Sequence, residues 1–167
     1  PVSLIVANAG INSAVGAHFT QTVGTRLAET ILTGTINPHA DDITIDGFTI
    51  DSGTRTRVVD TYADADRFVF RNNIFLNDSA DAPQGVMQFG GGSHVDCVFE
   101  YNLFQGGETA LLYTAGDFTG LQLRYNKINW EGDSVFWTAQ PLVDGVIQGN
   151  EFDGTIDGVS GVGYNTV

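Results

Sequence analysis

The sequence has very little cysteine and very little positive charge. Its 167 residues include one cysteine, one lysine and six arginines, against 20 acidic residues and a net charge of -13. A lone cysteine excludes an intramolecular disulfide framework and a cysteine-based zinc site. Because no basic surface is available to bind phosphates, nucleic acid and anionic membranes are not expected as partners. No run of about 18 apolar residues occurs, so membrane insertion is not expected either.

What the sequence does contain is enough apolar material for a core. Hydrophobic residues make up 42% of the chain and aromatic residues 11%, so the acidic excess does not indicate disorder. The length suits one domain. We therefore expect a single folded domain over residues 1–167, with its acidic side chains on the surface.

An internal repeat with a period of about 24 residues decides the expected fold. Five segments alternate apolar residues with other residues and are bounded by Gly, Asn or Asp. They start at Ile43, Phe68, Cys97, Leu121 and Gly145. The alternation is typical of strands, and the period is too short for a propeller blade but fits one coil of a solenoid. The sequence predicts an all-β parallel β-helix of about six coils, regular over residues 43–167. Residues 1–42 are expected to form irregular opening coils, with an excursion loop over Gly10–Gly24.

Aligning the repeats places like residues in columns. Two columns are apolar: Ile45, Phe70, Phe99, Leu123 and Ile147, and Ile50, Phe75, Phe104, Ile128 and Phe152. Between them lie Asn73, Asn102, Asn126 and Asn150, with Phe48 at the equivalent place in the earliest repeat. Equivalent residues of stacked strands lie about 4.8 Å apart, so the asparagine side chains should hydrogen-bond along their column. Asn also tolerates the left-handed backbone that a sharp corner needs. We therefore expect a structural asparagine ladder.

A further column alternates in charge. It contains Asp46, Arg71, Glu100, Arg124 and Gln148, one position after the first apolar column. Opposite charges on neighbouring strands contribute roughly 0.2–1 kcal/mol each, and a shift by one coil would bring like charges together. The column therefore indicates an outward-facing charge ladder that fixes register, in preference to a catalytic role for its charged residues.

The repeated coil, with its apolar alternation and its Asn corner, resembles the right-handed parallel β-helix of the pectin-lyase-like superfamily. The stretch SLIVANAGINSAVGA from Ser3, followed by ETILTGTI and DDITIDGFTIDSG, is similar to the opening coils of such modules in large bacterial secreted and cell-surface proteins. The resemblance implies a right-handed solenoid and an extracellular or cell-surface location. It implies no activity, because this architecture serves lyases, hydrolases, epimerases, tailspikes and adhesins alike.

The catalytic motifs of the β-helix enzymes are missing from the sequence. The Asp41-Asp42 pair has no matching acid, His or basic run, and the Asn37–Ala40 segment echoes an epimerase motif without its carboxylates. His94 and Asp96 come nearest to an acid–base pair, but no nucleophile accompanies them, and a solvated loop histidine is the simpler interpretation. No catalytic residue is therefore assigned, and the chain is not expected to be an enzyme.

Two loops between coils are rich in hard oxygen ligands. They contain Asp60, Asp64 and Asp66, and Asn77, Asp78 and Asp81. Such side chains bind calcium, the one cofactor that the sequence suggests. Solvated acidic loops are the alternative, because no EF-hand loop or Gly-Gly-x-Gly-x-Asp nonapeptide is present.

Aromatic residues form a candidate binding surface on another strand. Phe89, Tyr113 and Trp137 recur with the same period as the other columns. If they point outward, three stacked aromatic faces suit sugar rings or a protein partner. If they point inward, they belong to the core.

An apolar stripe is a second candidate surface. Val69, Val98 and Val146 share an outward-facing column that Gln122 interrupts, and such a stripe on an acidic body suits a packing partner. Cys97, by contrast, shares its column with apolar residues and is expected to be a buried hydrophobe.

The sequence thus predicts a non-catalytic extracellular structural or interaction module of a surface layer, fibre or adhesin. Uncapped coil ends are templates for strand addition, so the expected partners are flanking modules or other copies of the chain. The alternative is a polysaccharide-binding or polysaccharide-processing domain, lyase-like, hydrolase-like or part of a phage tail fibre, with glycans as its partners.

Overall fold

The structure is a computed structural model of the chain. It describes residues 2–10, 27–53, 55, 57–61, 63–77, 87–106, 110–129, 134–138 and 142–153. Within these residues the regular structure consists of 19 short strands, and no helix is present. Many of the strands are short because they end at a corner with left-handed backbone, as at Gly47, Asn72 and Tyr101 between sheets A and B.

The strands form four sheets. Sheet A contains β1 (Val2–Ile5), β3 (Ile43–Asp46), β6 (Val69–Arg71), β10 (Val98–Glu100), β14 (Gln122–Arg124) and β18 (Val146–Gln148). Sheet B contains β2 (Ile31–Thr33), β4 (Thr49–Asp51), β7 (Ile74–Leu76), β11 (Leu103–Gln105), β15 (Lys127–Asn129) and β19 (Glu151–Asp153). Sheet C contains β5 (Val59–Thr61), β8 (Met87–Phe89), β12 (Ala110–Thr114) and β16 (Ser134–Thr138), and sheet D contains β9 (Ser93–Val95), β13 (Asp117–Thr119) and β17 (Leu142–Val143).

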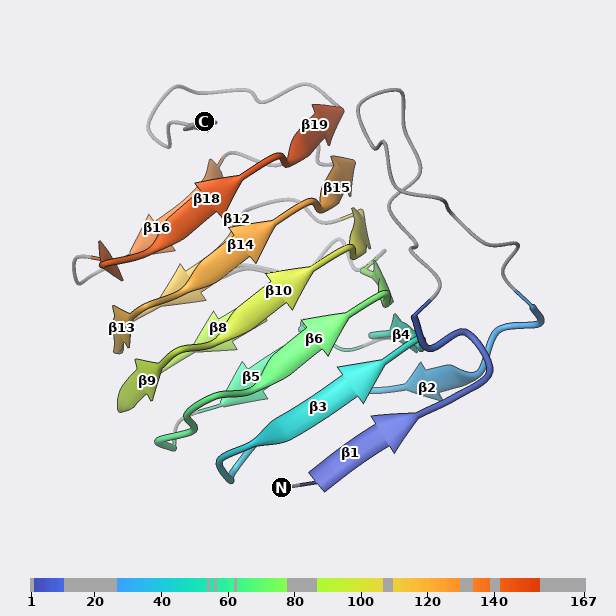
Figure 1. Ribbon diagram of the computed structural model, residues 1–167, viewed down its shortest axis with the longest axis horizontal. Coiled ribbons are helices and arrows are strands. Elements are labelled where there is room, and N and C mark those ends of the chain that lie inside the picture. The colour runs from blue at the N-terminus through green and yellow to red at the C-terminus, as the bar shows by residue number, and fades with distance from the viewer. Residues whose placement is uncertain are drawn as a thin grey trace.

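The chain visits these sheets in a repeating order. From β6 onward it passes through sheets A, B, C and D and then returns to sheet A, which adds one strand to each sheet (Figure 1). Neighbouring strands are parallel, as β10 is to β6 and to β14. We call one such passage a repeat. The expected all-β architecture of parallel sheets is confirmed, and it is compatible with a solenoid.

The two apolar columns lie in register as expected. Leu4, Ile45, Phe70, Phe99, Leu123 and Ile147 are successive Cα partners in sheet A, and Leu32, Ile50, Phe75, Phe104, Ile128 and Phe152 are successive partners in sheet B. Each column therefore extends one residue further toward the first repeat than the sequence alignment predicts.

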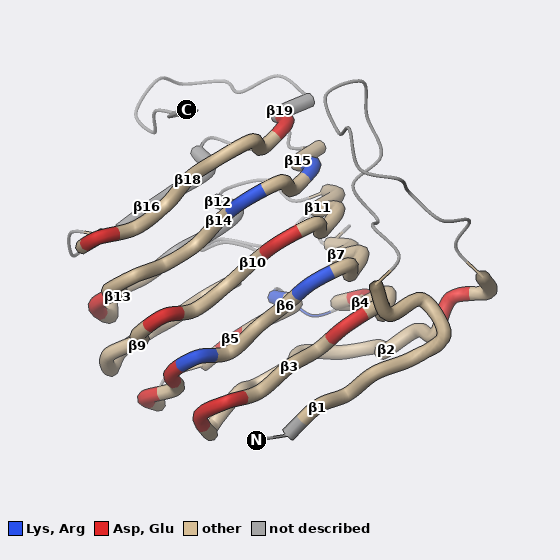
Figure 2. Tube along the Cα trace, viewed as in Figure 1, with Lys and Arg blue, Asp and Glu red and all other residues tan. Residues whose placement is uncertain are grey.

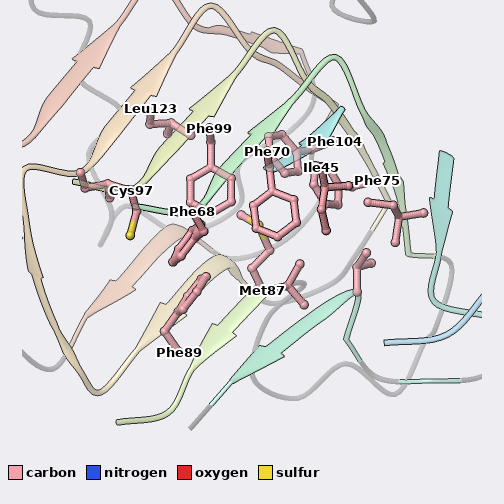
Figure 3. Close-up of a cluster of buried hydrophobic side chains, with 14 of the residues drawn as sticks. Ile45, Phe68, Phe70, Phe75, Met87, Phe89, Cys97, Phe99, Phe104 and Leu123 are labelled. Atoms are coloured by element: carbon pink, nitrogen blue, oxygen red, sulfur yellow. The ribbon is translucent and has the colours of Figure 1, made fainter. Parts of the chain in front are cut away.

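The core between the sheets is built from stacked phenylalanine rings (Figure 3). The ring centroids of Phe70 and Phe99 lie 5.5 Å apart, and the two rings are nearly parallel at 5°. Phe68 stacks in the same way on Phe89 of sheet C, at 5.4 Å and 3°. Because Phe68 directly precedes β6 while Phe89 belongs to β8, this contact ties sheet C to the sheet A side of the core.

The corner between sheets A and B differs from expectation in one respect. Left-handed backbone lies at the residue before each ladder position: Gly47, Asn72, Tyr101, Tyr125 and Gly149. The prediction that the ladder asparagines themselves take this conformation is therefore wrong. The rings of Tyr101 and Tyr125 stack at 5.4 Å, and a Cβ at Gly149 would lie 2.6 Å from Cδ1 of Tyr125. Gly149 is thus required both by the backbone and by the ring that covers it.

Candidate functional site

The asparagine ladder runs through the buried corner between sheets A and B. Asn102 Oδ1 accepts a hydrogen bond from the backbone N–H of Asn73 at 3.0 Å, and the same bond links Asn102 to Asn126 and Asn126 to Asn150, both at 2.9 Å. The ladder begins at Phe48, whose backbone N–H donates to Asn73 Oδ1 at 2.9 Å. All four asparagines are buried. The predicted ladder is confirmed.

The side-chain nitrogens of the ladder are used as well. Nδ2 of Asn102 donates to Asn126 Oδ1 at 3.0 Å and to the backbone oxygen of Phe70 at 2.9 Å. Nδ2 of Asn126 repeats this pattern with Asn150 and Phe99. Each central asparagine therefore satisfies backbone donors and acceptors at a corner where the strand hydrogen bonds are interrupted. Only a carboxamide offers both a donor and an acceptor in this shape.

The charge ladder crosses the outer face of sheet A. Acidic and basic residues alternate from β3 to β14 (Figure 2). Nε of Arg71 donates to Asp46 Oδ2 at 2.8 Å, and Arg124 lies 3.0 Å from Glu100. The backbone N–H of Gly10 also donates to Asp46 Oδ1, at 3.1 Å. The nearly buried Asp46 carboxylate thus joins three successive repeats, as expected for a ladder that fixes register.

The corner that leads into sheet A is also held by carboxylates. Asp41 Oδ1 accepts the backbone N–H of Asp66 at 3.0 Å, and Asp66 Oδ1 accepts that of Val95 at 2.8 Å. Beside them, Nε of Arg67 donates to Asp42 Oδ1 at 2.7 Å. This hydrogen bond lowers the pKa of the Asp42 carboxyl and raises the pKa of Arg67. The Asp41-Asp42 pair is therefore engaged in contacts between repeats.

The acids expected to bind calcium have other partners in the first of the two loops. Asp64 Oδ1 accepts the backbone N–H of Ser93 at 2.9 Å, and Asp60 Oδ2 lies 3.4 Å from Nη1 of Arg57. Together with Asp66, these residues bind neighbouring backbone and side-chain groups. They form no ligand cluster.

The second expected calcium loop is only partly described. Asn77 is buried and its Oδ1 accepts a hydrogen bond from Ser52 Oγ at 3.2 Å, whereas Asp78 and Asp81 lie outside the described residues. No group of three or more His, Cys, Asp or Glu side chains that could hold a metal occurs in the part of the chain that the structure describes. Calcium binding stays a prediction, which a fall in melting temperature on adding EDTA would support.

The expected aromatic column is out of register at its first member. Phe89 is the Cα partner of Thr114, and Tyr113 is the partner of Gln88 on one side and of Trp137 on the other. Phe89 is fully buried, so the core alternative holds for this residue. The prediction of a three-residue aromatic column is therefore wrong, and only Tyr113 and Trp137 are neighbours in sheet C.

The valine stripe is in register. Val69 pairs with Val98, Val98 with Gln122, and Gln122 with Val146 on sheet A. The three valines are half-buried or exposed, so the expected outward-facing column is confirmed. That a partner packs against this stripe stays a prediction.

A second lateral apolar cluster was missed in the sequence. Ile74, Leu76 and Leu103 are half-buried in β7 and β11, whereas Phe75 between the first two is fully buried. The signal that could have found them is the apolar residue on either side of the inward-facing Phe75. Because side chains alternate between the two faces of a strand, the neighbours of Phe75 must lie on the outer face, which is therefore also apolar.

His94 is part of the core. Its side chain is fully buried in β9, and its ring centroid lies 4.9 Å from that of Phe118. Nδ1 and Nε2 lie 3.1 Å from the carbonyl oxygens of Ala65 and Gly91, respectively. Its partners are therefore backbone carbonyls and not Asp96, and the interpretation as a solvated loop histidine is wrong. Three-residue strands give too little alternation to reveal such burial.

Cys97 is buried in the core, as its column predicts. Burial raises the pKa of its thiol from 9.0 to about 12. We therefore expect the native chain to resist a thiol reagent at neutral pH, while the chain in denaturant reacts fully. The measurement is the amount of chromophore released by an aromatic disulfide reagent.

The raised pKa of Cys97 also has a consequence for stability. The unfolded thiol ionises near pH 9.0 and the folded one near pH 12, so its contribution is complete below the first value and is lost as the pH rises toward the second. Denaturation curves of the wild type and of Cys97→Ala should converge or cross in this range. Equal pH dependence of the two chains, or rapid labelling of the native thiol, would contradict the burial.

Comparison with known proteins identified no relative of this chain. No protein-family model, no curated protein and no solved structure matches the chain. None of the described elements is a helix long and apolar enough to cross a membrane. The contacts of this chain alone therefore carry the functional proposal.

Proposed function

We propose that the chain is a right-handed parallel β-helix that acts as a non-catalytic extracellular structural or interaction module of a surface layer, fibre or adhesin. The observation that carries this proposal is the continuous ladder from Phe48 to Asn150. Its asparagines are buried and hydrogen-bonded along the direction in which the repeats follow one another. A body held together in this way is suited to spanning a distance and presenting a long side face.

The use of the remaining polar side chains supports the same role. Asp46 pairs with Arg71 and Glu100 pairs with Arg124. The carboxylates of Asp41, Asp64 and Asp66 accept hydrogen bonds from backbone N–H groups of neighbouring repeats. In an enzyme, such polar groups would be directed at a substrate. In this chain they join adjacent repeats instead. The stripe of Val69, Val98 and Val146 offers a lateral contact surface. The acidic composition, with a net charge of -13, supports the extracellular location.

The proposal is tested with a panel of acidic and neutral polysaccharides. The full chain is incubated with each polymer, and the release of reducing ends and of unsaturated sugar products is measured. We expect no product above that of a heat-denatured sample of the same chain. Sustained turnover of any polymer would overturn the non-catalytic role.

A polysaccharide-binding role is the second candidate, and the pairing of Tyr113 with Trp137 favours it. The two residues are Cα partners on adjacent strands, β12 and β16, which is the spacing at which aromatic residues can contact consecutive sugar units. The test is binding to a glycan array by the wild type, by Trp137→Ala and by Tyr101→Ala. This function requires a glycan signal that Trp137→Ala loses and Tyr101→Ala keeps. Absence of any signal leaves the structural role.

A further inference from the structure

The outer face of sheet A carries two columns of side chains on its four central strands, β3, β6, β10 and β14. One column is Thr44, Val69, Val98 and Gln122, and the other is Asp46, Arg71, Glu100 and Arg124. This face points toward the viewer in Figure 1, and no described strand lies in front of it. The two valines are half-buried, and the side chains of Arg71 and Arg124 are 43% and 37% exposed. The face therefore offers apolar and charged groups side by side.

The charges on these four strands balance, although the whole chain has a net charge of -13. Asp46 pairs with Arg71 at 2.8 Å, and Glu100 pairs with Arg124 at 3.0 Å. Two copies of a strongly acidic chain repel each other wherever their acidic surfaces meet. A face with equal numbers of acids and bases is where a second copy can approach with the least repulsion.

Both columns also match themselves when their order is reversed. From β3 to β14 the charges alternate between negative and positive (Figure 2), so the reversed order places each acid opposite a base. The other column is polar, apolar, apolar and polar, so its reversed order places valine opposite valine and Thr44 opposite Gln122. A two-fold axis along the strand direction, between β6 and β10, produces this reversal because it keeps each column opposite itself and inverts the order of the strands.

We propose that the outer face of sheet A is the docking surface for a second copy of this chain, bound face to face across this two-fold axis. Val69 then packs against Val98 of the second copy, and Arg71 lies opposite Glu100 of the second copy. Sheets that pack face to face lie about 10 Å apart with nearly aligned strands, which brings facing side chains into contact. This proposal rests on the structural role proposed above and names the partner for its lateral surface.

The charges of the two copies alternate around each contact. Beside the pair of Asp46 and Arg71 in one copy, the second copy places its Arg124 and Glu100. Every charge then has an unlike neighbour in its own copy and another across the interface. The Asp46 carboxylate is only 3% exposed, so it attracts the facing Arg124 at a distance, whereas Arg71 and Glu100 can form a hydrogen-bonded ion pair.

Other placements of the same two faces match less well. An axis along β10 places Glu100 opposite Glu100 of the second copy. An axis between β10 and β14 places Val98 opposite Gln122 and Arg71 opposite the neutral Gln148. An axis along the direction in which the repeats follow one another sets the valine column against the charge column. Because like charges and charges on apolar groups are unfavourable, the pattern selects the axis between β6 and β10.

The first test measures the mass of the full chain by sedimentation equilibrium over a wide concentration range. The salt concentration is set high enough to screen the net charge. We expect a reversible equilibrium between the chain of 17.9 kDa and a dimer of twice that mass. A single species of 17.9 kDa at the highest concentration would overturn the proposal.

Two complementary variants test the register. Val69→Glu and Val98→Lys each place a charge opposite a valine of the second copy, so we expect the dimer of either variant to be about tenfold weaker or more. In an equal mixture the introduced carboxylate faces the introduced ammonium group, and the mixed dimer should form about as tightly as the wild type. Among the face-to-face placements, only the proposed axis sets these two positions opposite each other. A mixture that dimerises no better than the separate variants would overturn this register.

Gln105→Lys is the matched control. Gln105 is exposed on β11, in the same repeat as Val98 but in sheet B. The control therefore makes the same change in net charge away from the proposed interface, and it should leave the dimer unchanged. Weakening equal to that of Val98→Lys would overturn the assignment of the interface to sheet A.

The urea transition of each variant checks its folding. If either valine variant lacks the cooperative unfolding of the wild type, Thr44→Lys and Gln122→Glu replace the pair, since these positions also face each other. Their mixture should dimerise more tightly than either variant alone, and absence of this gain would overturn the register.

The polysaccharide panel separates this proposal from the non-catalytic role. A monomeric wild type that releases no sugar would refute the dimer and leave the non-catalytic role intact. A dimer that degrades a polysaccharide would support the docking surface and refute the non-catalytic role.

Discussion

Replacing Phe99 by alanine is expected to lower the free energy of unfolding by about 3–5 kcal/mol. The Phe99 side chain is fully buried and stacks on Phe70 with ring centroids 5.5 Å apart. Its ring also makes edge contacts with Phe68 at 5.6 Å and with Phe89 at 6.3 Å. Alanine would remove all three ring contacts and leave a cavity that short strands pinned on both sides cannot close.

The matched control is Phe99→Leu, which keeps most of the apolar volume and should cost about 1–2 kcal/mol. Both variants are compared with the wild type by urea denaturation, with the slope of the transition recorded for each. A loss below about 1 kcal/mol for Phe99→Ala would mean that the phenylalanine stack is not what stabilises the interior.

Replacing Asn102 by alanine should lower the free energy of unfolding by about 2–4 kcal/mol, although only a few atoms are lost. The side chain accepts the backbone N–H of Asn73 at 3.0 Å and donates to the Phe70 carbonyl at 2.9 Å. Alanine leaves both groups buried without these bonds. The cost of an unsatisfied buried group exceeds the net value of the bond itself.

Hydrogen exchange separates this effect from a general loss of packing. In Asn102→Ala the Asn73 amide should exchange much faster than in the wild type, at a protein concentration and pH where both chains are folded. Gln122→Ala, an outward-facing change on β14 of the next repeat, should alter stability by no more than about 0.5 kcal/mol. Unchanged protection of the Asn73 amide in the Asn102 variant would contradict the ladder.

The period of the sequence determined the main columns of this protein. Where successive repeats have the same length, parallel pairing places residues such as Phe99 and Leu123 side by side, because each repeat adds one strand to each sheet. The alternation of apolar residues then fixes which side of a strand is buried. These two rules predicted both apolar columns, the asparagine ladder and the charge ladder, all from residues in sheets A and B.

The same reasoning failed in sheet C, at the pairing of β8 with β12. Val98 pairs with Gln122, the residue one period further on, whereas Phe89 pairs with Thr114, the residue after the one that the period predicts. One residue is therefore accommodated in a connection between sheets, and the sequence carries no signal for which connection takes it. Since side chains alternate, a difference of one residue separates Phe89 in the core from Tyr113 beside Gln88.

The sequence by itself determined which residues recur, and from that the parallel sheets, the buried phenylalanines and the lone inert cysteine. Only the tertiary structure decided the rest: that His94 is buried between backbone carbonyls, and that Asp64 and Asp66 accept hydrogen bonds from backbone N–H groups. The physical reason is the same in each case. Recurrence fixes neighbours along a column, but partners across a corner or at an end depend on where the connecting backbone lies in space.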